Sequence, residues 1–155
     1  MKRNLPILCA ITLAIAALSY FYSGFDDVSD VFAVNYKDRT AVKAGRVLYS
    51  DNCASCHGAR LEGEASDWRQ RNPDGSLPAP PHDETGHTWH HSDFMNFNTV
   101  KHGGLSDPDS NFISRMPAYK DVLSDKEIHD ILAYIKANWP NEIQRRHDAM
   151  NSKQN

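Results

Sequence analysis

Two cysteines and a histidine stand at a spacing that can do chemistry, in the run Cys53-Ala54-Ser55-Cys56-His57. Two thiols three positions apart can bond covalently to the two vinyl groups on one edge of a porphyrin. The histidine that follows immediately can turn its imidazole onto the iron from the proximal side. The run therefore predicts one covalently attached c-type haem, with Cys53 and Cys56 as its anchors and His57 as the proximal iron ligand.

Other uses of a C-x-x-C pair fit the sequence less well. A structural zinc site needs four closed ligands, and the only other cysteine, Cys9, lies in an apolar N-terminal segment. A thioredoxin-type redox pair follows a strand in a βαβ unit, whereas the residues before Cys53 have a helical pattern. A plain disulfide would leave His57 without a role, so haem attachment is the favoured interpretation.

The sixth coordination position of such a haem decides what the protein does. Methionine gives an electron carrier of raised potential, a second histidine lowers the potential, and an open site permits ligand binding or peroxidase chemistry. Met116 is the preferred distal ligand because Pro117 favours an extended backbone and lacks a donor. A thioether is also a soft ligand on a flexible stem. The other candidates are Met95, which core packing explains, Met150 near a polar terminus, and His82, His87, His90, His91 and His102.

Four of the eight histidines gather in the loop 82–91, beside two carboxylates. One hypothesis is a second metal site, with copper or zinc held by His87, His90 or His91. We favour an ordered loop over a haem edge, in which Trp89 shields the porphyrin and polar side chains bind the propionates or cap the next helix. No pair of histidines in this loop has a spacing specific to one metal.

The elements that must position these residues are expected to be helices. Val42, Gly45, Tyr49 and Cys53 recur at intervals of three or four residues, which predicts a helix from about Thr40 whose face leads into the haem site. Glycine in a helix interior costs about 1 kcal/mol relative to alanine. Its presence in this helix suggests that another element approaches closely.

Two further helices are predicted beyond a proline-rich loop over residues 58–91. The first runs from about Ser92, which caps it, to His102, where two glycines stop it. The second is the clearest helix in the sequence. Ser124 and Glu127 make a capping box, an apolar stripe follows, and the helix ends just before a Trp-Pro pair.

The N-terminus indicates export. Lys2 and Arg3 precede an uncharged run from Leu5 to Tyr22, and Gly24 follows. This pattern is typical of a secretory signal peptide or an uncleaved membrane anchor, and the run is just long enough to span a bilayer. The two basic residues keep the N-terminus in the cytoplasm, so everything after Gly24 is exported. Export also agrees with covalent haem attachment outside the cytoplasm.

The charge balance of the exported part is mildly acidic. Without Lys2 and Arg3, 15 basic residues remain against 20 acidic ones, which gives a net charge of −5. This balance argues against nucleic acid and favours a partner with a basic docking face. The expected organisation is residues 1–24 as signal peptide or anchor, 25–39 as an acidic linker, 40–140 as the haem domain, and 141–155 as a C-terminal helical extension and polar tail.

Three groups of residues together form a specific pattern: Gly45, Tyr49 and the run Cys53 to Gly58; Met116 to Tyr119; and Leu123 to Ile128 with Tyr134 and Ile135. This pattern resembles that of bacterial class I c-type cytochromes over about residues 40–140. The resemblance implies an all-α fold, a small helical bundle around one covalent haem c, in which the N- and C-terminal helices cross near Gly45 and Tyr134. It also implies thioethers at Cys53 and Cys56, with His57 and Met116 as the iron ligands.

The resemblance implies a one-electron carrier rather than an enzyme, in a periplasmic or membrane-associated electron-transfer chain. The expected partners are an oxidase, reductase or dehydrogenase, with the membrane reached through the N-terminal anchor. One alternative is a haem subunit of an oxidoreductase complex. Another is a periplasmic metal-handling protein that uses the His-rich loop 82–91. A dihaem peroxidase would need a second C-x-x-C-H run, and the sequence has one.

Overall fold

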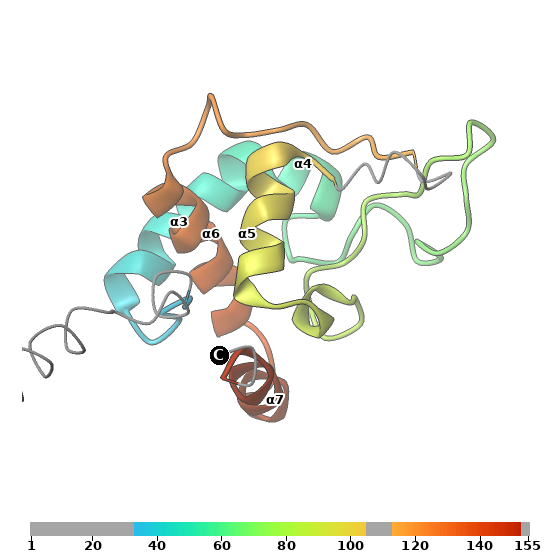
Figure 1. Ribbon diagram of the computed structural model, residues 1–155. Helices are drawn as coiled ribbons and strands as arrows, with labels where there is room; N and C mark the ends of the chain where they lie inside the picture. The colour runs from blue at the N-terminus through green and yellow to red at the C-terminus, as the bar shows by residue number, and fades with distance from the viewer. Residues whose placement is uncertain (1–32, 105–112, 153–155) are drawn as a thin grey trace, which may run out of the picture. The chain divides into compact units, whose positions relative to one another are not determined.

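The computed structural model describes residues 33–104 and 113–152. This part of the chain is helical and contains no strand beyond one isolated bridge between Ser76 and Ile113. The all-α class is confirmed. The elements are α3 (Arg39–Asn52), α4 (Ala54–His57), the 3-10 helix η1 (Thr88–His90), α5 (Asp93–His102), α6 (Asp125–Ala137) and α7 (Asn141–Asn151) (Figure 1).

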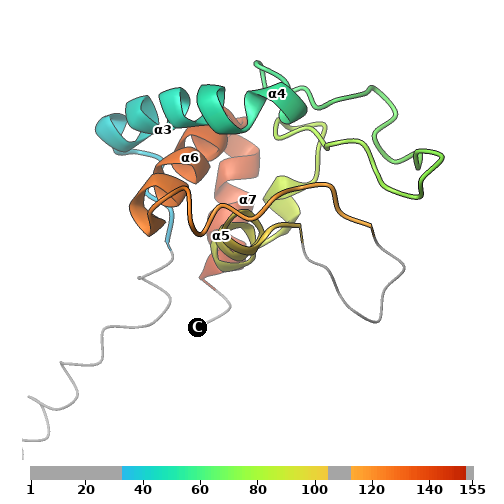
Figure 2. The same cartoon turned by 90° about the horizontal axis from the view of Figure 1, so that it is seen from above.

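Helix α3 crosses α6 at a glycine, as expected from its position in the helix (Figure 2). A Cβ atom at Gly45 would collide with the carbonyl group of Asp130, so no larger residue fits without moving one helix. One turn later, the rings of Tyr49 and Tyr134 lie with their centroids 5.4 Å apart. The predicted crossing of the N- and C-terminal helices near Gly45 and Tyr134 is confirmed.

The core is built mainly by the apolar stripe of α6. Ile128, Ile131 and Ile135 are each at most 2 % exposed and pack with buried side chains of α5. The capping box at the start of α6 is present: the Glu127 amide donates to Ser124 Oγ, and the Ser124 amide donates to the Glu127 carboxylate. The local sequence signals therefore fixed where this helix begins and which face it buries.

Helix α5 begins where its cap predicts, because Ser92 Oγ accepts a hydrogen bond from the Met95 amide. The helix ends at Gly103, whose φ of 82° favours glycine. The expectation that Met95 packs in the core is wrong, since its side chain is 40 % exposed. Phe97 and Val100, on the opposite face of the helix, are the residues that enter the core.

Two segments outside the central helices also pack on them. Helix α7 lies where a short helix after Pro140 was expected. Residues 33–38, expected to be the end of an acidic linker, lie against the helices: Val34 is 6 % exposed, and Tyr36 donates to Asp148 of α7 over 3.0 Å. Arg39, the last residue of that linker, begins α3, while residues 25–32, Cys9 and the proposed signal or anchor of residues 1–24 lie outside the described residues. None of the helices described has the length and apolar character needed to cross a bilayer.

Candidate functional site

The C-x-x-C-H run forms the end of α3 and the single turn α4. Cys53 lies between the two helices, and its carbonyl accepts from the amides of Cys56 and His57 over 3.1 and 2.9 Å. Cys53 is half-buried and Cys56 is exposed, and both thiols are free. Burial, with a smaller contribution from Cys56, raises the pKa of Cys53 to about 11, so this side chain is a neutral thiol near pH 7.

His57 presents one ring nitrogen for coordination. Its Nδ1 lies 2.8 Å from the Pro80 carbonyl oxygen. A carbonyl oxygen only accepts, so Nδ1 carries the proton and Nε2 has the lone pair that a metal requires. No residue in the described part of the chain hydrogen-bonds Nε2. The side chain is buried, and burial lowers the pKa of His57, which keeps the imidazole neutral.

Two more side chains fix the position of His57. The Tyr49 hydroxyl donates to the carbonyl oxygens of His57 and Gly58 over 3.3 and 3.0 Å. Burial raises the pKa of Tyr49, so this hydroxyl stays a donor. On the ring itself, the imidazole of His82 stacks with its centroid 4.0 Å away. The proximal side of the predicted site is thus a packed layer of rings and buried hydrogen bonds.

Met116 lies in an extended segment between α5 and α6 (orange in Figure 1), as its neighbour Pro117 predicts. Its side chain is half-buried and packs against the core. Tyr119 holds the segment in place, because its amide donates to Val100 of α5 and its hydroxyl donates to the Asn52 carbonyl over 2.7 Å. Since Asn52 directly precedes Cys53, the methionine segment is attached next to the predicted haem anchors.

One carboxylate joins the two segments that carry the predicted ligands. Glu64 Oε2 accepts from the Ala79 amide over 2.8 Å and from Arg115 Nη2 over 2.7 Å. Ala79 and Arg115 directly precede Pro80 and Met116 in the chain. The hydrogen bond from Ala79, and then Arg115, lower the pKa of Glu64, so the carboxylate stays ionised.

These residues fit a covalently bound haem. Two free thiols lie one turn apart, and a neutral imidazole follows them with its Nε2 available. The segment that carries a half-buried thioether is tied by Glu64 to the segment that holds the imidazole. Imidazole and thioether are iron ligands that haem proteins use, and the two thiols are the groups that a c-type haem needs for covalent attachment.

The family model named Cytochrome c matches residues 42–139. The chain belongs to the cytochrome c family. Membership implies one covalently bound c-type haem and electron transfer through it, as the sequence predicted. No curated protein and no solved structure shows significant similarity to the chain. Helix α7 and residues 33–41 lie outside the matched range.

The His-rich loop 82–91 does not assemble a second metal site. No group of three or more His, Cys, Asp or Glu side chains in the described ranges could hold a metal ion. The ring of His87 instead stacks on Trp68 at 4.9 Å, and that of His90 stacks on Trp89 at 3.7 Å. The hypothesis of a copper or zinc site at His87, His90 or His91 is therefore wrong for the described structure: although the rings of His87 and His91 lie edge-on with centroids 5.1 Å apart, no third ligating side chain joins them. The loop is ordered, while shielding of the porphyrin by Trp89 stays a prediction.

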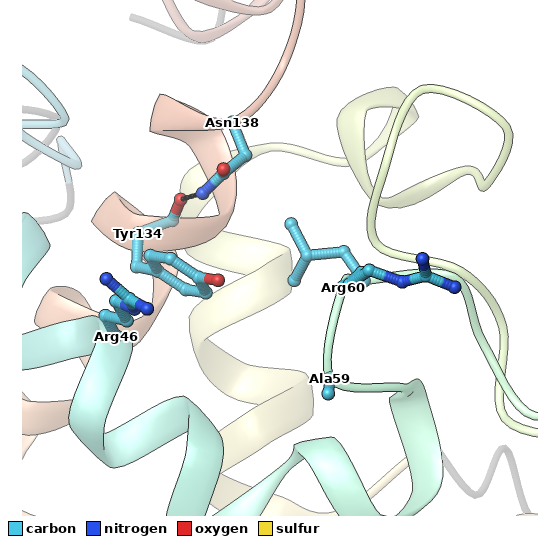
Figure 3. A pocket seen from close by; sticks show the side chains of 6 residues that line it. Arg46, Ala59, Arg60, Tyr134 and Asn138 are labelled. Carbon is cyan, nitrogen blue, oxygen red and sulfur yellow. Dashed lines mark hydrogen bonds between the residues drawn. The ribbon is translucent and has the colours of Figure 1, made fainter.

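The remaining candidate ligands lie in other places. Met95 and His102 are exposed on α5, and Met150 is half-buried on α7. An open pocket of about 410 Å³ lies where α3 and α6 meet the backbone after His57. It contains none of the predicted haem residues, and the Arg60 guanidinium points away from Tyr134 and Asn138 (Figure 3). Its lining residues are Arg46, Ala59, Arg60, Leu61, Tyr134 and Asn138.

Three residues that shape the site are missing from the sequence interpretation. The Pro80 carbonyl orients His57, Glu64 joins the two ligand segments, and the Trp139 indole donates to the His82 carbonyl over 2.8 Å. Two of these three contacts end on a backbone carbonyl, which every residue has. Residue type and spacing therefore gave no signal for them.

Proposed function

We propose that this protein is a one-electron carrier whose haem is anchored by Cys53 and Cys56 and ligated by His57 and Met116. The observation that carries the proposal is the link through Glu64, which joins the His57 side to the Met116 side. This link would keep His57 and Met116 at the same iron, and an iron held by both residues would have no open position for a substrate. This arrangement favours electron transfer over catalysis at the iron.

The haem supplies an iron that changes between its ferrous and ferric states with one electron. The two thiols fix one edge of the ring as thioethers, formed by addition of each S–H to a vinyl group. Pro80 and His82 hold the imidazole of His57 in one orientation. His57 and Met116 would hold the iron in both oxidation states, and residues kept in place by these contacts would let the electron transfer with little reorganisation.

We further propose that the protein works on the outer side of a bacterial cytoplasmic membrane. The charged N-terminus and the uncharged run that follows it support export, either with retention as an anchor or with cleavage. An anchor would raise the effective concentration of the haem domain near membrane-bound partners. The partners are an oxidase, a reductase or a dehydrogenase, and the same site would serve as the haem subunit of such a complex.

The optical spectrum of the oxidised, matured protein tests the proposal. A methionine ligand gives a weak far-red band from sulfur-to-iron charge transfer. We expect this band in the wild type and in Met95→Leu, a matched control because Met95 is exposed on α5. We expect its loss in Met116→Ala. A wild-type spectrum without the band, or a band that persists in Met116→Ala, would contradict the proposed ligand set.

A further inference from the structure

We propose that Trp139 and helix α7 are positioning elements for the proximal histidine, and that they act by holding both ends of the His-rich loop 82–91. The inference rests on the proposed function, in which His57 binds the iron. Helix α7 lies beyond the residues matched by the family model, so membership of the family implies no role for this helix. The contacts that support the proposal form a continuous series from α7 to the ring of His57.

The first contact holds the beginning of the loop. The Trp139 indole, only 4 % exposed, donates to the His82 carbonyl over 2.8 Å. Two other polar groups of His82 are also engaged: its amide donates to the Leu61 carbonyl, and its Nδ1 lies 2.8 Å from the Thr88 hydroxyl. The ring thus fixed is the one that stacks on His57 at 4.0 Å. Trp139 therefore acts on His57 through a single residue.

The second contact holds the end of the loop. His147 of α7 is 1 % exposed, and its Nε2 lies 2.8 Å from the His91 carbonyl oxygen. Its ring also packs edge-on against Trp139, with centroids 5.0 Å apart. The two side chains that hold the loop thus contact each other. A shift of α7 would move both ends of the loop together.

A group of charges centred on the buried Lys136 and Asp93 fixes α7 itself. Lys136 of α6 is 3 % exposed, and its ammonium lies 2.8 Å from Asp148 of α7 and 3.6 Å from Asp93 of α5. The Asp93 amide also donates to Asn151 of α7 over 2.8 Å. A buried charge that loses its partner is strongly destabilising. The protein therefore keeps α7 docked, rather than leaving it as a loose extension.

The effect on the iron follows from how a metal-bound histidine responds to its surroundings. Groups that hydrogen-bond or pack against such a ligand set its orientation and its basicity, and their loss typically weakens metal binding by about 10- to 100-fold. Here the loop supplies the stacked ring of His82, and Pro80 just before it accepts from His57 Nδ1. Release of the His82 carbonyl from Trp139 should change the orientation of the ligand ring.

The test uses full-length, matured holoprotein and the Trp139→Phe substitution, which keeps a packed ring and removes the N–H donor. The matched control is Trp68→Phe, because that ring is also buried but stacks on His87 in the same loop instead of donating to His82. The readouts are the hyperfine-shifted haem methyl resonances in the ferric NMR spectrum, which report the orientation of the axial ligands, and the reduction potential. We expect both to change in Trp139→Phe and to stay at wild-type values in Trp68→Phe.

A third variant keeps the test decisive if Trp139→Phe does not fold. Benzothienylalanine at position 139 replaces the indole N–H by sulfur with nearly the same shape, and it should change the same signals. At the other end of the loop, His147→Leu should shift the resonances and His147→Gln, which retains a donor for His91, should restore them. Wild-type resonances and potential in the position-139 variants, with the far-red band intact, would overturn this inference alone. A wild-type protein without that band would overturn the proposed function instead.

Discussion

Buried hydrogen bonds and stacked rings hold His57 in place, whereas Met116 lies on a segment whose polar contacts are partly exposed. On the His57 side, the Pro80 carbonyl and the His82 ring surround a side chain that is 8 % exposed. On the Met116 side, the ion pair that links the segment to the rest of the site has side chains 48 % and 42 % exposed. The two predicted iron ligands are therefore held by contacts of different strength.

This difference predicts which substitutions should destabilise the whole domain and which should release only one ligand. A buried polar group that loses its partner costs about 1–3 kcal/mol, and a buried charge costs more. An exposed ion pair contributes about 0–1 kcal/mol. Changes on the His57 side should therefore lower the stability of the whole domain, whereas changes on the Met116 side should release the ligand from a domain that stays folded.

The largest effect is expected at the charges that dock α7 on the His57 side. Lys136→Met leaves the buried carboxylate of Asp93 without its cation, which should lower the free energy of unfolding by about 3–5 kcal/mol. Lys101→Met is the control, since the side chains of its pair with Asp125 are 28 % and 64 % exposed and the pair should contribute below about 1 kcal/mol. Urea unfolding of the two variants measures the difference. Equal losses of unfolding free energy in the two variants would show that burial of this charge cluster adds nothing to stability.

A smaller loss is expected at the hydroxyl that holds the backbone of His57. Tyr49→Phe removes one donor from the carbonyl oxygens of His57 and Gly58, which keep their backbone amide donors, and should cost about 0.5–1.5 kcal/mol. The neighbouring Tyr134→Phe keeps the same pair of packed rings and should change stability by less than about 0.5 kcal/mol. Thermal unfolding monitored by circular dichroism compares them. If Tyr134→Phe proved the more damaging variant, the importance given to the Tyr49 hydroxyl would be wrong.

The third prediction concerns acid and the histidine that holds the end of the loop. Burial, and then Lys136, lower the pKa of His147 below its ordinary value near 6.5, although Asp93 and Asp148 also face it and act in the opposite direction. The unfolded chain therefore binds a proton at a higher pH than the folded one. The stability contributed by neutral His147 is complete above about pH 6.5 and declines as the pH falls below it, by at most about 1.4 kcal/mol per pH unit.

His147→Gln isolates this contribution, because the amide can still donate to the His91 carbonyl and does not titrate. Unfolding free energies at pH 7.5 and 5.5 should fall more steeply in the wild type than in the variant. Other buried histidines keep some slope in both proteins. Parallel pH profiles would mean that His147 does not contribute to the acid sensitivity.

The smallest effect on stability is expected on the Met116 side. Glu64→Gln removes the ion pair with Arg115, and its stability should stay close to that of the wild type because both side chains are partly exposed. Added imidazole should nevertheless displace the methionine at a concentration up to about fivefold lower, as judged from the far-red band. Glu62→Gln, which affects an exposed pair with Arg60, is the control and should titrate like the wild type.

The parts of the fold that could be predicted depend on local signals. Ser92 and the Ser124–Glu127 box begin their helices as expected, because a cap acts within one turn. Gly45 indicated a close helix crossing because glycine destabilises a helix interior, and such a cost suggests that a neighbouring helix leaves no room for a Cβ atom. Residue type also selected Met116, and the structure places it in a segment whose Tyr119 bonds the carbonyl of Asn52, the residue before Cys53.

The parts that could not be predicted depend on contacts between distant residues. Val34 is buried, and its amide donates to the carboxylate of Asp93, 59 positions away in the sequence. Its sequence neighbours nevertheless predict a linker. The neighbouring Phe94 and Phe97 predict that Met95 packs in the core. Only Phe97 is buried, however, and Phe94 is 51 % exposed. The loop histidines suggested a metal site because residue types are visible in a sequence and ring stacking is not.

The most direct test of this comparison follows both ligands in one experiment. Matured, oxidised wild-type protein is titrated with urea while the far-red band reports Met116 and far-UV circular dichroism reports the helices. We predict that the band disappears at a lower urea concentration than the helical signal, because the exposed contacts of the Met116 segment yield before the buried layer around His57. Coincident transitions would show that both ligand segments unfold as one unit, and would contradict the account.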